Sequence, residues 1–130
     1  MKIFPDFTWE WIIESCERLC NELQTLSADP EWHHLSESFE AYYQVERGTV
    51  AIVHELRKHP ELEKLVPMRS MRTLRWFPSE GREIQLYCLE NKVKYRIDVC
   101  KNGVVEEEKI VAFDEAVDEV YAYISRLSTD

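Results

Sequence analysis

The sequence predicts an α+β fold with an N-terminal helical pair, a four-stranded antiparallel meander and a C-terminal amphipathic helix packed on the sheet. The early residues carry apolar side chains at helical spacing, the middle alternates apolar and polar residues between short turns, and the last stretch returns to helical spacing. With 130 residues, we expect one domain over 1–130, with a helical part over 8–66 and the meander and final helix over 69–128.

The first helix is expected from Thr8 to Leu26, because apolar residues recur there at spacings of three and four. The members of this face are Ile12, Cys16, Leu19, Leu23 and Leu26. Asp29 is expected to cap a following helix, and Pro30 suits the first turn of that helix, where a missing N–H has no cost.

A second helical stretch is expected from Pro30 to His59, and Pro60 ends it. Gly48 lies in the middle and costs about 1 kcal/mol relative to alanine in a helix. We expect one long helix, with two helices meeting near Arg47 and Gly48 as the alternative.

Three turn sequences predict the register of the meander. They are the three-residue loops Ser79–Gly81 and Lys101–Gly103 and the two-residue turn Asn91–Lys92. The resulting pairs are Trp76 with Ile84, Leu74 with Leu86, Cys88 with Tyr95, Leu86 with Ile97, Ile84 with Val99, and Cys100 with Val104. Because separate turns place the apolar residues on one face, the register is supported by more than alternation alone.

The apolar face is predicted to comprise Leu74, Trp76, Ile84, Leu86, Cys88, Tyr95, Ile97 and Val99. The opposite face is predicted to comprise Thr73, Arg75, Gln85, Tyr87, Lys94, Arg96 and Asp98. The fourth strand, Val104 to Val111, contains three successive glutamates, as an exposed edge strand allows. Asp114 is expected to cap the final helix, which runs to about Leu127.

The net charge of −9 is unevenly distributed. Residues 1–56 carry −8, residues 57–101 carry +5 and residues 102–130 carry −6. An acidic chain argues against a general nucleic-acid coat protein, while the basic middle keeps a local anion site open. The first eleven residues are no secretory signal, and no apolar run is long enough for a membrane span, so we expect a soluble cytoplasmic protein with no membrane partner.

The sequence nominates no metal site, cofactor or catalytic residue. His54 and His59 are five apart, whereas two zinc-binding histidines on one helix are four apart. Cys16 and Cys20 share a helical face, and we interpret them as small core residues. No phosphate-binding glycine loop or dinucleotide fingerprint is present in the sequence.

The candidate binding residues are Arg75, Tyr87, Lys94 and Arg96 on the polar sheet face. Sheet faces with aromatic and guanidinium groups bind single-stranded nucleic acid or acidic peptides, but the same residues also stabilise solvated sheets through cross-strand pairs. If the first two helices cover this face, no such site exists.

The leading hypothesis is a small non-catalytic protein-binding or regulatory module, for example an inhibitor or immunity-type protein, with a protein partner or self-association. Acidic helix residues would meet a basic enzyme, and their charge would speed association. These residues are Glu14, Glu17, Glu22, Glu37 and Glu40. The alternatives are an anion or single-stranded nucleic-acid module on the polar sheet face, and a small enzyme whose site the sequence does not nominate.

Overall fold

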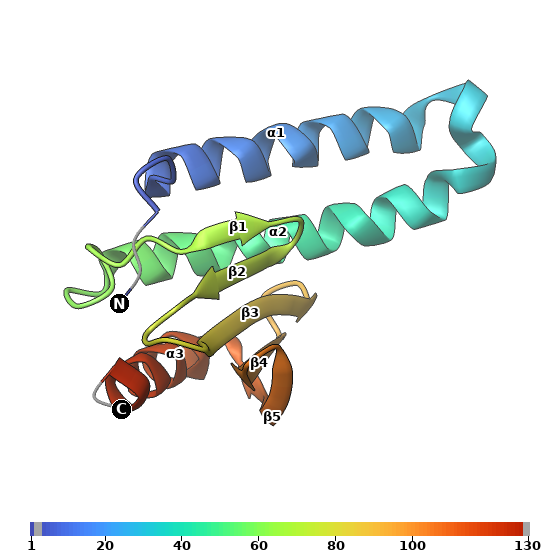
Figure 1. The fold of residues 1–130 in the computed structure, drawn as a ribbon. Helices are drawn as coiled ribbons and strands as arrows, with labels where there is room; N and C mark the ends of the chain where they lie inside the picture. The colour runs from blue at the N-terminus through green and yellow to red at the C-terminus, as the bar shows by residue number, and fades with distance from the viewer. Residues whose placement is uncertain (2–3, 129–130) are drawn as a thin grey trace.

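A helical hairpin forms the first half of the chain in the computed structural model, which describes residue 1 and residues 4–128 (Figure 1). Helix α1 spans Trp9–Ala28 and helix α2 spans Ser36–Lys58, and the 3₁₀ turn η1, Pro30–Leu35, joins them. Thr8 caps α1, since its hydroxyl accepts from the Trp11 amide at 3.0 Å. Asp29 caps η1 as predicted, because its carboxylate accepts from the Glu31 amide at 2.9 Å.

The prediction of one helix through Gly48 is confirmed, although the α-helix begins at Ser36 rather than Pro30. Gly48 is needed for close packing of α2 on the sheet. Its carbonyl accepts from the Tyr95 hydroxyl at 2.8 Å, and a Cβ placed there would lie 2.2 Å from the Cys88 sulfur. The helix therefore tolerates the entropic cost of glycine in return for this contact.

Five antiparallel strands follow, in the order β1-β2-β3-β4-β5. Their bounds are Met68–Ser70 for β1, Thr73–Trp76 for β2, Arg82–Glu90 for β3, Lys94–Lys101 for β4 and Val104–Ala112 for β5. The prediction of four strands is therefore one short. Strand β1 has only three residues, all of them half-buried, so its sequence shows no alternation of buried and exposed positions. It is joined to β2 by Met71–Arg72, which is not a recognisable turn sequence, and the strand is therefore not predicted.

The predicted register of the central strands is confirmed. Trp76 pairs with Ile84, Leu86 with Ile97, and Cys88 with Tyr95. The whole predicted apolar face is buried, and it belongs to a hydrophobic cluster that also includes residues of all three α-helices. The alternation of apolar and polar residues in the sequence therefore correctly predicts which face of the sheet lies in the core.

Two turns differ from the prediction. Lys101 pairs with Val104 and Cys100 with Val105, so the last loop is the two-residue turn Asn102–Gly103. The φ angles of Asn102 and Gly103 are 51° and 82°, the pattern of a type I′ turn, which Asn-Gly favours. An irregularity between Val99 and Cys100 absorbs the change in register.

The β3–β4 turn is also longer than predicted, because Glu90 pairs with Lys94 and leaves three residues between them. Lys92, not Asn91, adopts positive φ, at 59°. The side-chain amide nitrogen of Asn91, Nδ2, donates to the side-chain oxygen Oε1 of Gln44 in α2 at 3.0 Å. The left-handed position of the longer turn is therefore occupied by the lysine rather than by the asparagine.

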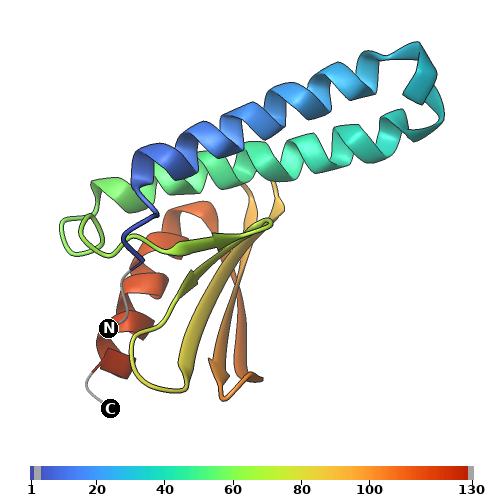
Figure 2. The same cartoon turned by 45° about the horizontal axis from the view of Figure 1, so that its top comes forward.

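Helix α3, Phe113–Ser128, begins directly after β5, so Asp114 lies in its first turn rather than at its cap. Both α2 and α3 pack on the apolar face of the sheet: Tyr95 contacts Gly48 of α2, and its ring lies 5.9 Å from that of Phe113. The three α-helices thus lie on one side of the sheet, and none of the described helices covers the polar face (Figure 2). None of the described helices combines the length and apolarity that crossing a bilayer requires.

Edge strand β5 directs two charged side chains toward α3, on the same face as the buried Val111. Lys109 pairs with Glu119 at 2.9 Å, and Glu107 pairs with Arg126 at 3.0 Å. Glu107 also accepts a hydrogen bond from the Tyr123 hydroxyl at 3.1 Å. Inward-pointing charges of this kind are a known means by which proteins protect an exposed sheet edge from pairing.

Candidate protein-binding surface

The four predicted binding residues lie on the polar sheet face, and two of them form ion pairs within it. Arg75 pairs with Glu83, which raises the pKa of the guanidinium. Arg96 pairs with Asp98 at 2.9 Å and with Glu108 at 2.7 Å. Each guanidinium is therefore neutralised locally, which weakens its attraction for an external anion.

The other two predicted residues differ in exposure. Tyr87 is half-buried, and the Arg96 guanidinium carbon lies 5.6 Å from its ring centroid. Burial, together with the nearby Asp98 carboxylate, raises the pKa of the Tyr87 hydroxyl. Lys94 is exposed at the start of β4. These contacts are those of cross-strand pairs that stabilise a sheet, and a binding role for the four residues stays a prediction.

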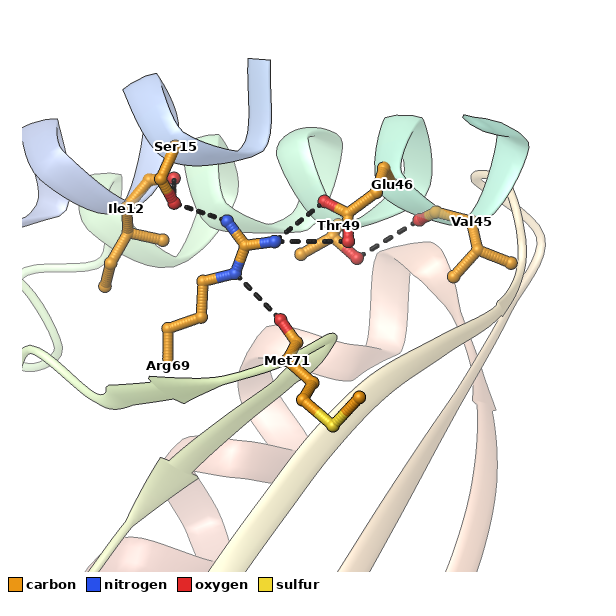
Figure 3. Close-up of polar contacts among 7 residues, drawn as sticks. All are labelled: Ile12, Ser15, Val45, Glu46, Thr49, Arg69 and Met71. Carbon is orange, nitrogen blue, oxygen red and sulfur yellow. Dashed lines mark hydrogen bonds and ion pairs between the residues drawn. The ribbon is translucent and has the colours of Figure 1, made fainter. Parts of the chain in front are cut away.

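A buried ion pair that the sequence analysis does not predict joins α2 to β1 (Figure 3). Glu46 is 0% exposed, and both of its carboxylate oxygens accept from Nη2 of Arg69, at 3.0 and 3.1 Å. Nη1 of Arg69 donates to the Ser15 hydroxyl of α1, and its Nε donates to the Met71 carbonyl at 3.0 Å. One guanidinium thus joins both helices of the hairpin to the first strand and its turn, and we call Glu46 and Arg69 the clamp.

The environment of the clamp is apolar. Burial raises the pKa of Glu46, and the charge of Arg69 opposes that rise. The neighbouring Cys16 thiol hydrogen-bonds to Glu46, and burial raises the pKa of Cys16 to about 12. Because a thiol with so high a pKa stays protonated at neutral pH, Cys16 is a packing residue, as the sequence predicts.

Beyond the clamp, the hairpin extends past the sheet as a finger, which we define as residues 24–45 (Figures 1 and 2). No residue of the finger is buried, whereas Leu23 and Glu46, which flank it, both are. Ordered helices normally bury one face against another element. The finger is therefore a projection without a core of its own.

The finger carries an apolar stripe that continues a core-facing stripe of α2. Two series of positions in α2 repeat every seven residues. They are 35, 42, 49 and 56, and 39, 46 and 53, and both series lie on one side of the helix. On the core side of the clamp, Thr49, Val53 and Leu56 are at most 2% exposed. In the finger, Leu35 is 37% and Tyr42 is 42% exposed. The same helical face thus passes from the core into solvent.

Aromatic residues also occupy the tip of the finger. Trp32 is 43% exposed, and its ring lies 6.5 Å from that of Phe39 and 6.4 Å from that of His34. Large aromatic side chains of this kind are enriched where proteins bind one another. The tip and the stripe together form an apolar surface on a projecting element.

The charge of the finger is of one sign. It contains four carboxylates and no lysine or arginine. Of the five acidic helix residues nominated from the sequence, Glu37 and Glu40 lie in the finger, and all five are exposed. The finger is therefore negatively charged, with Glu37 and Glu40 on the side of α2 away from the apolar stripe, and this net charge favours a cationic partner.

The histidines and cysteines give no sign of a metal centre in the described part of the chain, where no group of three or more suitable side chains converges. The His59 ring contacts the Tyr121 ring, with 4.9 Å between centroids and an angle of 37° between the ring planes. All four cysteines are free and buried.

Comparisons with protein-family models, with curated proteins and with solved structures found no match for this chain.

Proposed function

We propose that this chain is a small protein-binding module whose finger binds a basic surface of a partner protein. The observation that carries the proposal is the α2 stripe, which is buried on the core side of the clamp, whereas beyond it Leu35 and Tyr42 are exposed and Phe39 is half-buried. A protein gains nothing in its own stability from ordered apolar residues held in solvent, whereas a partner that covers them gains the hydrophobic free energy of their burial.

The clamp supports this proposal by fixing the direction of the finger. Replacing a buried ion pair by apolar residues is often neutral or stabilising, so such pairs are better explained by orientation than by stability. Here Arg69 ties Ser15 of α1 and Glu46 of α2 to the sheet at the point where the finger begins. A finger held in one orientation loses less conformational entropy on binding than a mobile one.

The test compares three immobilised proteins in native extract at low salt: the wild type, a finger variant with Glu37→Lys and Glu40→Lys, and a control with Glu115→Lys and Asp118→Lys. Both variants change charge by the same amount, at residues three apart near the start of a helix. We expect proteins retained by the wild type and by the control to be lost from the finger variant, and to be released as salt rises.

A retained protein is then purified and its affinity for the three chains measured directly. Retention of the same proteins by all three chains, or of none by the wild type, contradicts the proposal.

A further inference from the structure

A polar hollow of about 260 Å³ lies between α1 and α2, at the inner end of the finger. Residues of both helices line it, among them Glu17, Cys20 and Asn21 of α1 and Tyr43, Arg47 and Val50 of α2. Cys20 and Val50 are buried, whereas Glu17, Asn21 and Arg47 are exposed. The hollow therefore has small apolar residues at its base and polar side chains around its opening.

The hollow opens on a different side of α2 from the apolar stripe. Arg47 follows Tyr42 by five residues, which places the two side chains about 140° apart around an α-helix. An inference about the hollow is therefore independent of the function proposed for the finger.

Glu17 and Arg47 bring opposite charges to the hollow from different helices without pairing. Neither side chain forms a hydrogen bond or an ion pair with any described residue. Burial raises the pKa of the Cys20 thiol, and the charge of Arg47 lowers this pKa while that of Glu17 raises it further. Both charges thus act on the same point at the base of the hollow.

We infer that the hollow binds a small zwitterion, namely a free α-amino acid with a polar side chain. Its carboxylate binds the Arg47 guanidinium and its ammonium group binds the Glu17 carboxylate. The volume of the hollow is smaller than the roughly 300–1,000 Å³ of sites for drug-sized ligands, which limits the ligand to a small molecule.

The two charges disfavour simpler ions. Glu17 repels an anion that has no cationic group, and Arg47 repels a cation that has no anionic group, whereas a zwitterion satisfies both. Guanidinium groups also match the geometry of a carboxylate. The side chains of Asn21 and Tyr43 have no hydrogen-bond partner among the described residues, so they are available to a polar side chain of the ligand.

The probes are L-serine, L-asparagine and L-glutamine, each added to the isotopically labelled full chain. Binding is followed by NMR through the backbone amide resonances of Cys20, Asn21 and Arg47. Two derivatives of each probe lack one charge, since the N-acetyl form has no ammonium group and the α-amide has no carboxylate. We expect at least one amino acid to shift these resonances saturably, and both of its derivatives to bind at least about tenfold more weakly.

Variants assign each charge of the ligand to its partner. Arg47→Gln should weaken binding of the amino acid at least about tenfold but should not weaken binding of the α-amide, which has no carboxylate to lose. Glu17→Gln should in the same way leave binding of the N-acetyl form unchanged. Arg18→Gln and Glu14→Gln are the controls, because they remove the same charges from exposed positions of α1 that do not line the hollow. All four positions are exposed, so we expect little change in Tm.

The inference is overturned if none of the three amino acids gives saturable shifts at these residues at millimolar concentrations. Equal losses of affinity in Arg47→Gln and Arg18→Gln, or in Glu17→Gln and Glu14→Gln, also overturn it, because the overall charge of the chain would then determine binding. An N-acetyl derivative that binds as tightly as its parent amino acid would show that the hollow accepts anions and does not select zwitterions.

Discussion

Glu46 is the first buried residue of α2, and both of its carboxylate oxygens accept hydrogen bonds from the same nitrogen of Arg69, at 3.0 and 3.1 Å. Removing one member of the pair leaves the other charge buried without its partner. We expect Arg69→Met to lower the free energy of unfolding by about 3–5 kcal/mol.

A double-mutant cycle in urea tests the coupling between Glu46 and Arg69. The double variant Glu46→Leu with Arg69→Met should be more stable than the sum of the single changes implies, by about 0.5–3 kcal/mol. Strict additivity would show that the two residues act independently. The finger remains helical in either case, which circular dichroism checks.

The contact between Gly48 and Cys88 yields a prediction that opposes helix propensity. Alanine is preferred to glycine in a helix by about 1 kcal/mol. We nevertheless expect Gly48→Ala to destabilise the protein by about 1–3 kcal/mol, because its Cβ would lie 2.2 Å from the Cys88 sulfur.

Shortening the opposing side chain provides the control for Gly48. Cys88→Ala removes that sulfur, so the double variant Gly48→Ala with Cys88→Ala should recover part of the loss in chemical denaturation. A stabilising Gly48→Ala would contradict the close packing of α2 on the sheet.

The buried thiols predict a loss of stability at alkaline pH. Burial raises the pKa of Cys16 to about 12 and the pKa values of Cys20 and Cys88 to about 11. In the unfolded chain these thiols ionise near a pKa of about 8.5. Their contribution to stability is therefore complete below that pH and declines as the pH rises toward 11, because the unfolded state alone releases protons.

The measurement is the free energy of unfolding between pH 7 and pH 10 under reducing conditions. Each thiol contributes a slope of at most about 1.4 kcal/mol per pH unit above its unfolded pKa. Cys16→Ala should have a shallower slope than the wild type. Identical slopes would mean that Cys16 ionises equally in both states.

Leu86 lies at the centre of the apolar sheet face and is 0% exposed. Leu86→Ala should cost about 2–5 kcal/mol, through lost burial and the cavity left behind. Val104→Ala, at a position 66% exposed on β5, is the control and should change the urea midpoint little. An unchanged midpoint in Leu86→Ala would contradict the packing of the helices on this face.

Periodicity in the sequence predicts the elements that bury one face. The alternation around Ile84 and Leu86 predicts the register of β2, β3 and β4, because a slip of one residue would move every apolar side chain into water. Strand β1 escapes prediction because three half-buried residues carry no period. The left-handed Lys92 escapes because the turn has three residues rather than the two that Asn91–Lys92 suggests.

The proposed binding surface is less predictable than the fold for a related reason. An apolar stripe such as Leu35, Phe39 and Tyr42 indicates a buried helical face. The sequence does not show at which residue of the helix this face stops being buried by the rest of the fold. Glu46 is the available signal, since it is a carboxylate at a core-facing position and so requires a partner. Arg69 is separated from it by more than twenty residues, and spacing within one helix does not connect them.

The charged interior side of β5 also bears on how the molecule meets its own copies. A second chain that paired its edge strand with β5 would have to accommodate Glu107 and Lys109, which already form ion pairs with residues of α3. Ribbon-like polymers joined edge to edge are therefore disfavoured even at high concentration. The contacts proposed for the projecting helices differ in kind, because a helix backbone is internally hydrogen-bonded and only its side chains are available to a partner.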